Sequence, residues 1–389
     1  MKILHVVPSY IPAYRYGGTI ESVHGLCKGL AESGHEIHVF TTNIDGDKDL
    51  NVPLERPIDL DGVKVWYFPL KNPRRLCYSP SMGRALRREV ENFDLAHLHS
   101  IFLWPTWVAA RAARNRSIPY IISPHGMLIK ELIRRKSHFA KTAWIHFIEK
   151  ENLERSAALH MTSQIEADEA ARFGFRLPNI FVISNGVNVP PIASGAELPP
   201  AVRAIVAKER FILFLGRVNW KKGLDRLIPA LSYVPDLRLV IAGNDDENYQ
   251  PVLEALADRC GVRERLAFTG FVRGAEKAAL LGHAAVLVLP SYSENFGIVV
   301  LEAMAFGCPV AVTPEVGAAE IVREERAGSI LNGDPEELGR GINTMLADPL
   351  KLRDMGERGR RAALEKYTWT AAAKRMAEVY ESILARGGL

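Results

Sequence analysis

The stretch AVLVLPSYSENFGIVVLEAMAFGCPVAVT, residues 285–313, carries the pattern from which the fold follows. It opens with the apolar run Ala285–Leu289, passes through a polar turn, and continues as an apolar helical segment from about Gly297. It ends in a second apolar run, Val310–Thr313. Two short apolar runs separated by a helix are typical of parallel strands joined by a crossover. The stretch therefore predicts one strand–helix–strand unit of a parallel sheet that is covered on both faces.

The same alternation of apolar runs and amphipathic segments extends in both directions along the chain. Ten further strands are predicted at Ile3–Val7, Ile37–Thr41, Val63–Phe68, Leu95–His99, Tyr120–Ser123, Leu159–Thr162, Phe181–Ile183, Phe211–Leu215, Leu237–Ile241 and Leu266–Thr269. A helix is predicted over Ile20–Glu32, with Gly34 as its C-cap. From Pro335 onward the pattern is helical to the end. This alternation predicts an α/β fold.

A proline-rich stretch divides the chain into two parts. Residues 187–202 hold four prolines and have no apolar periodicity, which is typical of a linker. A chain of 389 residues is also too long for one compact domain. We expect two doubly wound domains, at residues 1–190 and 191–370, facing each other across a cleft. Open parallel sheets bind ligands beyond the carboxyl ends of their strands, so ligand chemistry is expected there.

Composition excludes several classes of protein. The chain is 48% hydrophobic and 24% charged, as in ordinary globular proteins. Its net charge of +4 is too small to indicate a nucleic-acid partner, but anionic ligands are not repelled. The four cysteines are widely spaced, which argues against disulfides or a zinc site and fits a reducing compartment. Neither an export signal nor a membrane span is recognisable, so a cytoplasmic protein is expected.

The turn after Leu289 carries the most informative chemistry. The main-chain N–H groups of Asn295–Gly297 are predicted at a helix N-terminus, where a phosphate or a sugar hydroxyl is favoured. Glu294 lies in the turn, and Glu302 lies about one and a half helical turns further along. Two carboxylates that flank an anion-binding helix start suit a sugar nucleotide, because each can hold a pair of hydroxyls. The alternative, exposed surface carboxylates, is disfavoured by the apolar residues on both sides of Glu302.

A second constellation lies in FILFLGRVNWKKGLDRLI, residues 211–228. Here a strand runs into Gly216 and Arg217, and Lys222 follows just before a helix. A planar guanidinium and a compact ammonium above one strand end could together neutralise a pyrophosphate. The alternative is an ordinary solvated basic loop, and Lys221 is predicted to be solvated in either case.

The first strand is followed by a glycine pair, Gly17 and Gly18, just before a helix expected from about Thr19. Glycines at this place permit close approach of the backbone to a ligand, although a plain turn is an equal alternative. The pair is not part of a GxGxxG fingerprint, and the chain contains no GxxxxGK[ST] sequence. A dinucleotide-binding domain and a P-loop nucleotidase are therefore disfavoured.

Two further groups of residues carry polar or metal-ligating side chains. His125 directly follows the strand Tyr120–Ser123, so it is expected at a carboxyl end, whereas His97 and His99 are expected in the core or at its rim. None of these histidines has a convincing metal-ligand spacing. Asp45-Gly46-Asp47 matches a metal-binding DxD pattern but is predicted to be a surface loop. No metal or other cofactor is therefore expected, and cationic side chains and helix dipoles would offset the charge of a leaving group.

Basic residues and aromatics are interleaved over residues 128–155, and residues 71–116 are also rich in basic side chains. Basic amphipathic helices with aromatics can lie on anionic membranes. A solvated helix face that packs on the domain core is at least as good an interpretation. Peripheral contact with the inner membrane face is therefore one of two expectations.

Taken together, these motifs resemble the retaining GT-B glycosyltransferases of glycosyltransferase family four. The mark of the resemblance is Glu294-x7-Glu302, supported by Gly216-Arg217, the KKG sequence at 221–223 and NGV at 185–187. The resemblance implies two Rossmann-like domains, with the acceptor bound by residues 1–190 and the nucleotide sugar by residues 191–370. It also implies that a helix at 371–389 returns to the N-terminal domain.

The resemblance further assigns roles to the candidate residues. The implied donor-binding residues are Gly17, Gly18, Arg217, Lys222, Glu294, Asn295, Phe296, Gly297 and Glu302. Of these, Arg217 and Lys222 would hold the diphosphate, Glu294 the sugar and Glu302 the ribose. His125 would contact the transferred sugar, and it joins Arg217, Lys222 and Glu294 in the expected catalytic set.

The implied reaction moves a hexose from a nucleotide-diphosphate sugar, with UDP favoured over GDP, to a saccharide or lipid-linked saccharide in cell-surface polysaccharide synthesis. No carboxylate stands out as a nucleophile, so front-face attack is expected instead of double displacement. Two alternatives remain open: a nucleotide-sugar epimerase or hydrolase on the same fold, and a non-catalytic sugar-binding protein.

Overall fold

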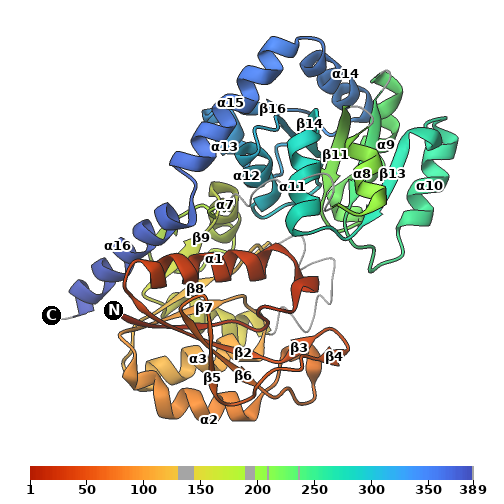
Figure 1. Cartoon of the computed structure of the whole chain (residues 1–389). Helices are drawn as coiled ribbons and strands as arrows, with labels where there is room; N and C mark the ends of the chain where they lie inside the picture. Colours follow the sequence, from red (N-terminus) through yellow and green to blue (C-terminus); the bar gives the residue numbers. More distant parts are fainter. Residues whose placement is uncertain (130–143, 189–197, 208–209, 235–236, 388–389) are drawn as a thin grey trace. The chain divides into compact units, whose positions relative to one another are not determined.

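The computed structural model describes residues 1–129, 144–188, 198–207, 210–234 and 237–387 (Figure 1). The chain forms two compact units, an N-terminal unit of Met1–Gly186 with Trp369–Leu389 and a C-terminal unit of Val187–Thr368. The unit boundaries lie within a few residues of the expected ones. Part of the basic segment 128–155 and part of the linker 187–202 lie outside the described residues.

The N-terminal unit is built on an eight-stranded sheet with the order β10-β9-β8-β7-β1-β2-β6-β5. Its strands are β1 (Lys2–Val6), β2 (Glu36–Thr42), β5 (Pro57–Leu60), β6 (Val63–Phe68), β7 (Leu95–His99), β8 (Tyr120–Ser123), β9 (Ala158–Met161) and β10 (Ile180–Val182). All neighbours pair in parallel except β5, which is antiparallel to β6. The strand order reverses between β1 and β7, which marks a topological switch point.

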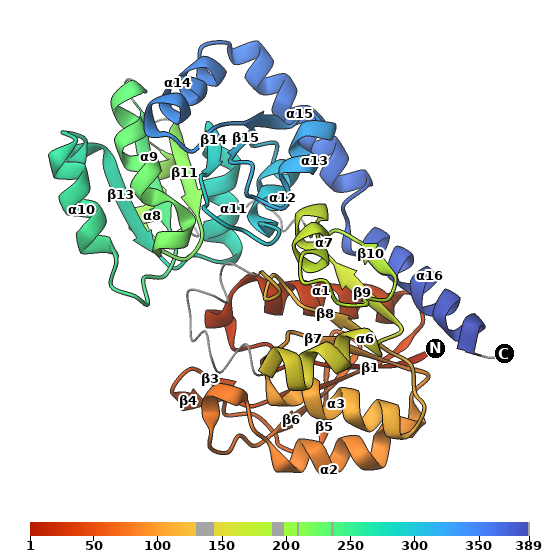
Figure 2. The ribbon, with the colours of Figure 1, turned by 180° about the vertical axis from the view of Figure 1, so that it is seen from behind.

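Helices cover both faces of this sheet, as Figures 1 and 2 show. They are α1 (Gly18–Glu32), α2 (Pro80–Glu89), α3 (Trp104–Asn115), α6 (Lys150–Glu154), α7 (Gln164–Ala171) and α16 (Trp369–Gly387). On one face, α2, α3, α6 and α7 bury Leu86, Ala109, Leu153 and Ala170 against the strands. On the other face, α1 and α16 pack against each other. The C-terminal helix therefore belongs to the N-terminal unit.

The contact between α1 and α16 depends on glycine. A Cβ atom added to Gly25 would lie 2.2 Å from the indole of Trp369, and one added to Gly29 would lie 2.8 Å from the Trp369 carbonyl oxygen. Trp369 is itself buried. The indole therefore occupies the space that a side chain on this face of α1 would need, so α1 and α16 pack closely.

Gly25→Ala is expected to destabilise the protein, although alanine favours a helix over glycine by about 1 kcal/mol. Overpacking a buried ring costs about 1–3 kcal/mol, and at 2.2 Å the clash outweighs the gain in helix propensity. Urea unfolding measures the net effect, with Glu32→Ala at an exposed position of α1 as a control that stays within about 0.5 kcal/mol of the wild type. A Gly25→Ala protein at least as stable as the wild type would contradict this packing.

The C-terminal unit has a six-stranded sheet, all parallel, with the order β13-β12-β11-β14-β15-β16. Its strands are β11 (Phe211–Leu215), β12 (Arg238–Ala242), β13 (Leu266–Gly270), β14 (Val286–Leu289), β15 (Val310–Val312) and β16 (Gly328–Ile330). Its helices are α8 (Pro200–Val206), α9 (Leu224–Ala230), α10 (Gln250–Arg259), α11 (Gly274–His283), α12 (Ile298–Ala305), α13 (Ala319–Glu324), α14 (Pro335–Leu346) and α15 (Pro349–Glu365). The order reverses between β11 and β14, the two strands whose following loops carry the candidate motifs.

All twelve predicted strands are present within one or two residues of the expected bounds, and the helical C-terminus is confirmed. The prediction missed β5 and β16, as well as a small hairpin of β3 (Ile44–Asp45) and β4 (Lys48–Asp49). Gly46 at the tip of this hairpin donates its N–H to the hydroxyl of Tyr16 over 2.8 Å. The Asp45–Asp47 segment is thus a surface turn, as predicted. None of the described helices is long and apolar enough to cross a bilayer.

Candidate functional site

The carboxyl ends of β11 and β14 bring the two main motifs together. The ammonium of Lys222 donates a hydrogen bond to Oε2 of Glu294, although the two residues are 72 positions apart. The two side chains are only 17% and 18% exposed. An ion pair that is largely removed from water is stronger than one on an open surface, because screening is weaker there. Both residues were predicted as site residues, but their pairing was not.

Glycines allow the two loops to approach this closely. Gly223 has a φ of +69°, and a Cβ added to it would lie 2.0 Å from the carbonyl oxygen of Pro290. The amide of Tyr292 donates to the carbonyl oxygen of Lys221 over 2.8 Å. A Cβ added to Gly216 would lie 4.0 Å from Nζ of Lys222, so the ammonium sits above the end of β11. Any side chain at 223 would separate the loops.

The turn that carries Glu294 is held from its other side by the loop after β15. The Glu294 amide donates to the carbonyl oxygen of Glu315 over 3.1 Å, and the Gly317 amide donates back to Glu294 over 2.9 Å. Gly297 has a φ of +84° and is the N-cap of α12. In the described part of the chain, the N–H groups of Phe296 and Gly297 have no hydrogen-bond acceptor. They are donors available at a helix start.

Glu302 lies on α12 and is bound by a residue that the sequence did not reveal. Nζ of Lys277, on α11, donates to Oε1 of Glu302 over 2.7 Å. The two side chains are 21% and 15% exposed. The carboxylate of Glu302 is thus largely buried and paired, which excludes the disfavoured alternative of an exposed helix residue. No sequence signal indicates which face of α11 meets Glu302.

Arg217 and Lys221 differ in their surroundings. Arg217 is exposed, and among the described residues it has no hydrogen-bond or ion-pair partner. The loop on which it lies is fixed, because the Val218 amide donates to Asn244 and a Cβ on Gly243 would lie 1.8 Å from the Gly216 carbonyl oxygen. Lys221, predicted to be solvated, is half-buried with its ammonium 6.0 Å from the centre of the Trp220 ring.

In the N-terminal unit, the glycine pair forms the start of α1. Gly17 has a φ of +76° and is the N-cap, and the exposed Gly18 is the first helical residue. His125 follows β8 and has a φ of +52°, a conformation that non-glycine residues rarely adopt. The carboxylate of Glu166 accepts a hydrogen bond from the Gly126 amide over 2.6 Å, which holds the turn that follows His125. Strained backbone of this kind is common at functional sites.

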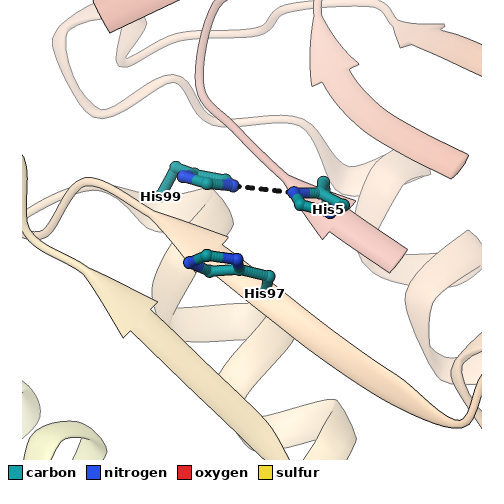
Figure 3. Close-up of side chains that lie close together, drawn as sticks. All are labelled: His5, His97 and His99. Carbon is teal, nitrogen blue, oxygen red and sulfur yellow. Dashed lines mark hydrogen bonds between the residues drawn. The ribbon is translucent and has the colours of Figure 1, made fainter. Parts of the chain in front are cut away.

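His125 ends a chain of buried histidines drawn in part in Figure 3. Its Nε2 lies 3.0 Å from Nδ1 of His99, whose Nε2 lies 2.9 Å from Nδ1 of His5. His5 Nε2 is buried, with no partner in the described structure. An unpaired buried N–H is rarer than an unpaired acceptor, so the proton of His5 belongs on Nδ1. Each ring then donates to the next, and His125 carries its own proton on Nδ1.

A second chain of hydrogen bonds has its direction set by a carbonyl group. His160 Nε2 lies 3.0 Å from the carbonyl oxygen of Ile183, which can only accept, so Nε2 carries the proton. Ser123 then donates to His160 Nδ1 over 2.8 Å and accepts from His97 Nε2 over 2.6 Å. The hydroxyl of Tyr380, on α16, donates to His97 Nδ1 over 2.7 Å. Every proton in this chain is thereby assigned.

His5, His97 and His99 lie close enough together to suggest a metal site. Both ring nitrogens of His97, however, already bind Tyr380 and Ser123, outside the trio. Nδ1 of His5 and Nε2 of His99 bind each other. His97 therefore has no ring nitrogen left for a metal ion, and the trio as arranged does not fit a metal centre. The expected burial of His97 and His99 is confirmed.

Burial keeps these rings neutral. It lowers the pKa of His5 and of His125 to about 3 and that of His160 to about 4, and in His5 and His125 the nearby His160 adds to the effect. Burial also holds the pKa values of His97 and His99 well below 6.5. A protonated ring would lose its acceptor nitrogen and break the chain of hydrogen bonds.

Acid is therefore expected to destabilise the protein between pH 6.5 and 4. In this window the histidines of the unfolded chain bind protons and those of the folded chain do not. The free energy of unfolding therefore decreases as the pH is lowered, by up to about 1.4 kcal/mol per pH unit for each such histidine. Urea unfolding at pH 7, 6 and 5 measures the slope, and His160→Gln is expected to flatten it. The exposed His283 provides the control variant His283→Asn. An unchanged slope in His160→Gln would contradict the assignment.

Comparisons with known proteins show the family of the chain. Residues 17–186 match the model of the glycosyl transferase 4-like domain, and residues 199–362 match that of the glycosyl transferases group 1. The chain therefore belongs to the GT-B glycosyltransferases, and family four is consistent with both matches. The prediction of a glycosyltransferase and the predicted GT-B fold are confirmed.

Among the similar proteins, an uncharacterized glycosyltransferase of Methanocaldococcus jannaschii is 29% identical and matches over 98% of both chains. A D-inositol 3-phosphate glycosyltransferase of Xylanimonas cellulosilytica is also 29% identical, over 95% of this chain and 93% of the relative. The solved sucrose-phosphate synthase of Thermosynechococcus elongatus has a TM-score of 0.77 at 23% identity, covering 99% of both chains. Anabaena HepE, solved in complex with UDP-glucose, has a TM-score of 0.76 at 22% identity, covering 98% and 100%.

Proposed function

We propose that this glycosyltransferase moves a hexose, with retention of configuration, from a nucleotide-diphosphate sugar to a saccharide or lipid-linked saccharide acceptor. UDP is the favoured nucleotide, GDP is the alternative, and cell-surface polysaccharide synthesis is the proposed setting. The observation that carries the proposal is the largely buried pair of Lys222 and Glu294 beside the available N–H groups at the start of α12. At one edge of the sheet, a cation could bind the phosphates of such a donor, and a carboxylate and available N–H groups could bind its hydroxyls.

In the proposed reaction, Lys222 and Arg217 bind the diphosphate. The charge on the leaving phosphate grows as the bond to the sugar breaks, and positive groups that are already in place stabilise that charge. Lys222 is held by Glu294, so its ammonium needs little reorganisation. Arg217 has no hydrogen-bond or ion-pair partner among the described residues, so its guanidinium is available for phosphate oxygens. The proposal requires no metal cofactor for these roles.

Carboxylates and amides would bind the hydroxyls of the donor. Glu294 would hold hydroxyls of the hexose together with the N–H groups of residues 295–297. Glu302 would hold the ribose, with Lys277 fixing the orientation of its carboxylate. The similarity to a D-inositol 3-phosphate glycosyltransferase, to a sucrose-phosphate synthase and to HepE, which was solved with UDP-glucose, supports a nucleotide-sugar donor.

Two features of the N-terminal unit enter the proposal. The amides at Gly17 and Gly18, at the start of α1, would contribute to phosphate binding. His125, with its proton on Nδ1, would donate to a hydroxyl of the transferred sugar and steady its developing charge. Among the described residues its Nδ1 has no other acceptor, so this donor is available. Basic residues within 71–116 could also bring the unit to a membrane surface.

Front-face attack would explain retention. The acceptor oxygen bonds to the anomeric carbon on the side from which the phosphate departs, and the proton of the acceptor passes to that phosphate. A double displacement would need a free carboxylate near the sugar. Glu166, which binds the turn after His125, is buried and accepts hydrogen bonds from Gly126 and from Thr162. Its oxygens are thus already engaged.

Lys222→Ala and Glu294→Ala are each expected to lower kcat/KM for transfer by at least about 100-fold. The first removes a preorganised positive charge at the leaving group, and the second removes the carboxylate that holds this charge and the hexose. A transfer assay with radiolabelled UDP-glucose and a saccharide acceptor measures this, and circular dichroism checks the fold. Lys351→Ala, an exposed lysine of α15, is the control. Full activity of either site variant would refute the proposal.

The same assay without acceptor separates the alternatives. A transferase consumes the donor slowly when no acceptor is present, since only water competes. Rapid stoichiometric release of free sugar, or of an epimeric donor, would identify a hydrolase or an epimerase instead. Binding of a plain sugar with no dependence on a nucleotide would identify a sugar-binding protein.

Lys277→Gln is expected to raise the KM for the donor by about five- to tenfold while kcat changes little. This change in KM corresponds to about 1–1.4 kcal/mol, less than a full charge-assisted hydrogen bond, because Lys277 acts on the ribose only through Glu302. It affects binding of the ribose in ground and transition states alike. Steady-state kinetics with the donor varied tests this. Arg273→Gln, one residue before α11 on an exposed position, is a suitable control. A fall in kcat at constant KM would contradict the assigned role.

A further inference from the structure

A groove of about 570 Å³ runs between α2 and α3 of the N-terminal unit, on the face of the sheet opposite to α1. Its lining repeats at the spacing of a helix face. Pro80, Gly83, Arg84 and Arg87 come from α2, and Trp104, Trp107, Val108, Arg111, Ala112 and Asn115 from α3. Residues three and four positions apart lie on one side of a helix, so each helix turns one continuous stripe toward the groove.

The aromatic side chains of the groove are held in place. A Cβ added to Gly83 would lie 3.0 Å from the Trp104 ring, so the absence of a side chain there makes room for the indole. Tyr78 meets Trp104 edge to face at 5.2 Å between ring centres. Trp107 is similarly supported by Trp144, at 6.3 Å. The indoles thus form a fixed wall and are only half-buried.

Three arginines surround the same hollow without a counter-charge. Arg84, Arg87 and Arg111 are exposed, and none of them has an ion-pair partner among the residues that the structure describes. Neighbouring arginines outside the groove do have partners, since Arg88 binds Glu89 and Arg116 binds Glu91, both over 2.6 Å. Like charges around one hollow repel each other, and an anion bound there would relieve that repulsion.

We propose that this groove binds a phosphate or diphosphate ester, the phosphorylated part of the acceptor. Guanidinium groups bind phosphate oxygens through paired hydrogen bonds, and indole faces offer apolar contact to a sugar ring or an alkyl chain. The volume falls in the range of small-molecule sites, roughly 300–1,000 Å³. This identity of the ligand rests on the proposed transferase function, whereas anion binding by the groove does not.

The direction of the groove fits an acceptor. Both α2 and α3 follow strands of the parallel part of the sheet, β6 and β7, so their first residues lie at the carboxyl edge. The Trp104 end of the groove is therefore near the edge where the strand order reverses, and the Arg111 end is farther from it. A ligand whose phosphate lies among the arginines can extend its saccharide toward that edge.

The test measures anion binding by the full-length protein. Inorganic pyrophosphate is titrated by calorimetry into the wild type, into the triple variant R84Q/R87Q/R111Q, and into R88Q, which changes a neighbouring arginine outside the groove. Glutamine keeps the length and polarity of these exposed side chains but removes the charge, and thermal melting verifies the fold. The single variant Arg111→Glu provides a second test with one exposed position changed.

We expect pyrophosphate affinity at one site to fall at least tenfold in the triple variant and in Arg111→Glu, and to be unchanged in R88Q. A site that survives in all variants with wild-type affinity would overturn the proposal. Because a second pyrophosphate site is expected at Lys222, the Lys222→Ala protein must retain the groove site. Loss of activity in Lys222→Ala tests the proposed function separately, so the two failures are distinguishable.

Vesicle flotation then distinguishes the source of the phosphate. Binding to phosphatidylglycerol vesicles that is lost in the triple variant, with no binding to phosphatidylcholine vesicles, supports a lipid-borne phosphate. Groove-dependent binding of pyrophosphate without any vesicle binding supports a freely dissolved phosphorylated acceptor. Vesicle binding that is equal in the wild type and the triple variant, with no groove-dependent pyrophosphate binding, would contradict the proposed site.

Discussion

The ion pair between Lys222 and Glu294 is the constraint on which the C-terminal unit's site depends. It joins the loops after β11 and β14, the two strands at which the order of the sheet reverses. Because both side chains are largely buried, removing either one leaves a charge with little solvation, which destabilises more than the pair itself stabilises. The close approach of the loops also requires a glycine at position 223. The two sequence motifs, the glycine backbone and the ion pair thus meet at the carboxyl ends of β11 and β14.

In the N-terminal unit, a chain of hydrogen bonds holds His125 in one protonation state. His125 lies at the end of a strand in a left-handed conformation, and its ring is oriented by His99 and His5. Each neutral ring carries one proton, so the positions of the protons in this chain follow from His5, whose unpartnered Nε2 leaves the proton on Nδ1. The low pKa values, caused mainly by burial, keep this order intact near neutral pH. A fixed donor is therefore available on His125.

Much of the fold and of the C-terminal site could be predicted from the sequence. The predicted strands are near-continuous apolar runs bounded by Gly, Pro or Asn, which mark buried parallel strands clearly. The missed strands lack this signal, since Pro57–Leu60 alternates with polar residues and Gly328–Ile330 is only three residues long. Glu294 and Lys222 could be recognised because each lies in a distinctive local motif.

The remaining contacts depend on tertiary structure that no local pattern contains. Lys277 is one of several polar residues on α11, and only the packing of α11 beside α12 brings it to Glu302. The histidine chain joins His5 to residues more than 90 positions away. The groove between α2 and α3 likewise forms where one stripe of residues on each helix meets the other, and neither stripe alone predicts it. Side-chain pairs of this kind become visible only when the register and the helix rotations are known.

The most direct measurement of the central claim compares the binding of UDP and UMP to the wild type and to Lys222→Gln by calorimetry. The account predicts that the wild type prefers the diphosphate by at least about tenfold, or 1.4 kcal/mol, because the ammonium meets the second phosphate. It further predicts that this preference largely disappears in Lys222→Gln while the affinity for UMP changes little. An undiminished preference for the diphosphate in Lys222→Gln would contradict the account.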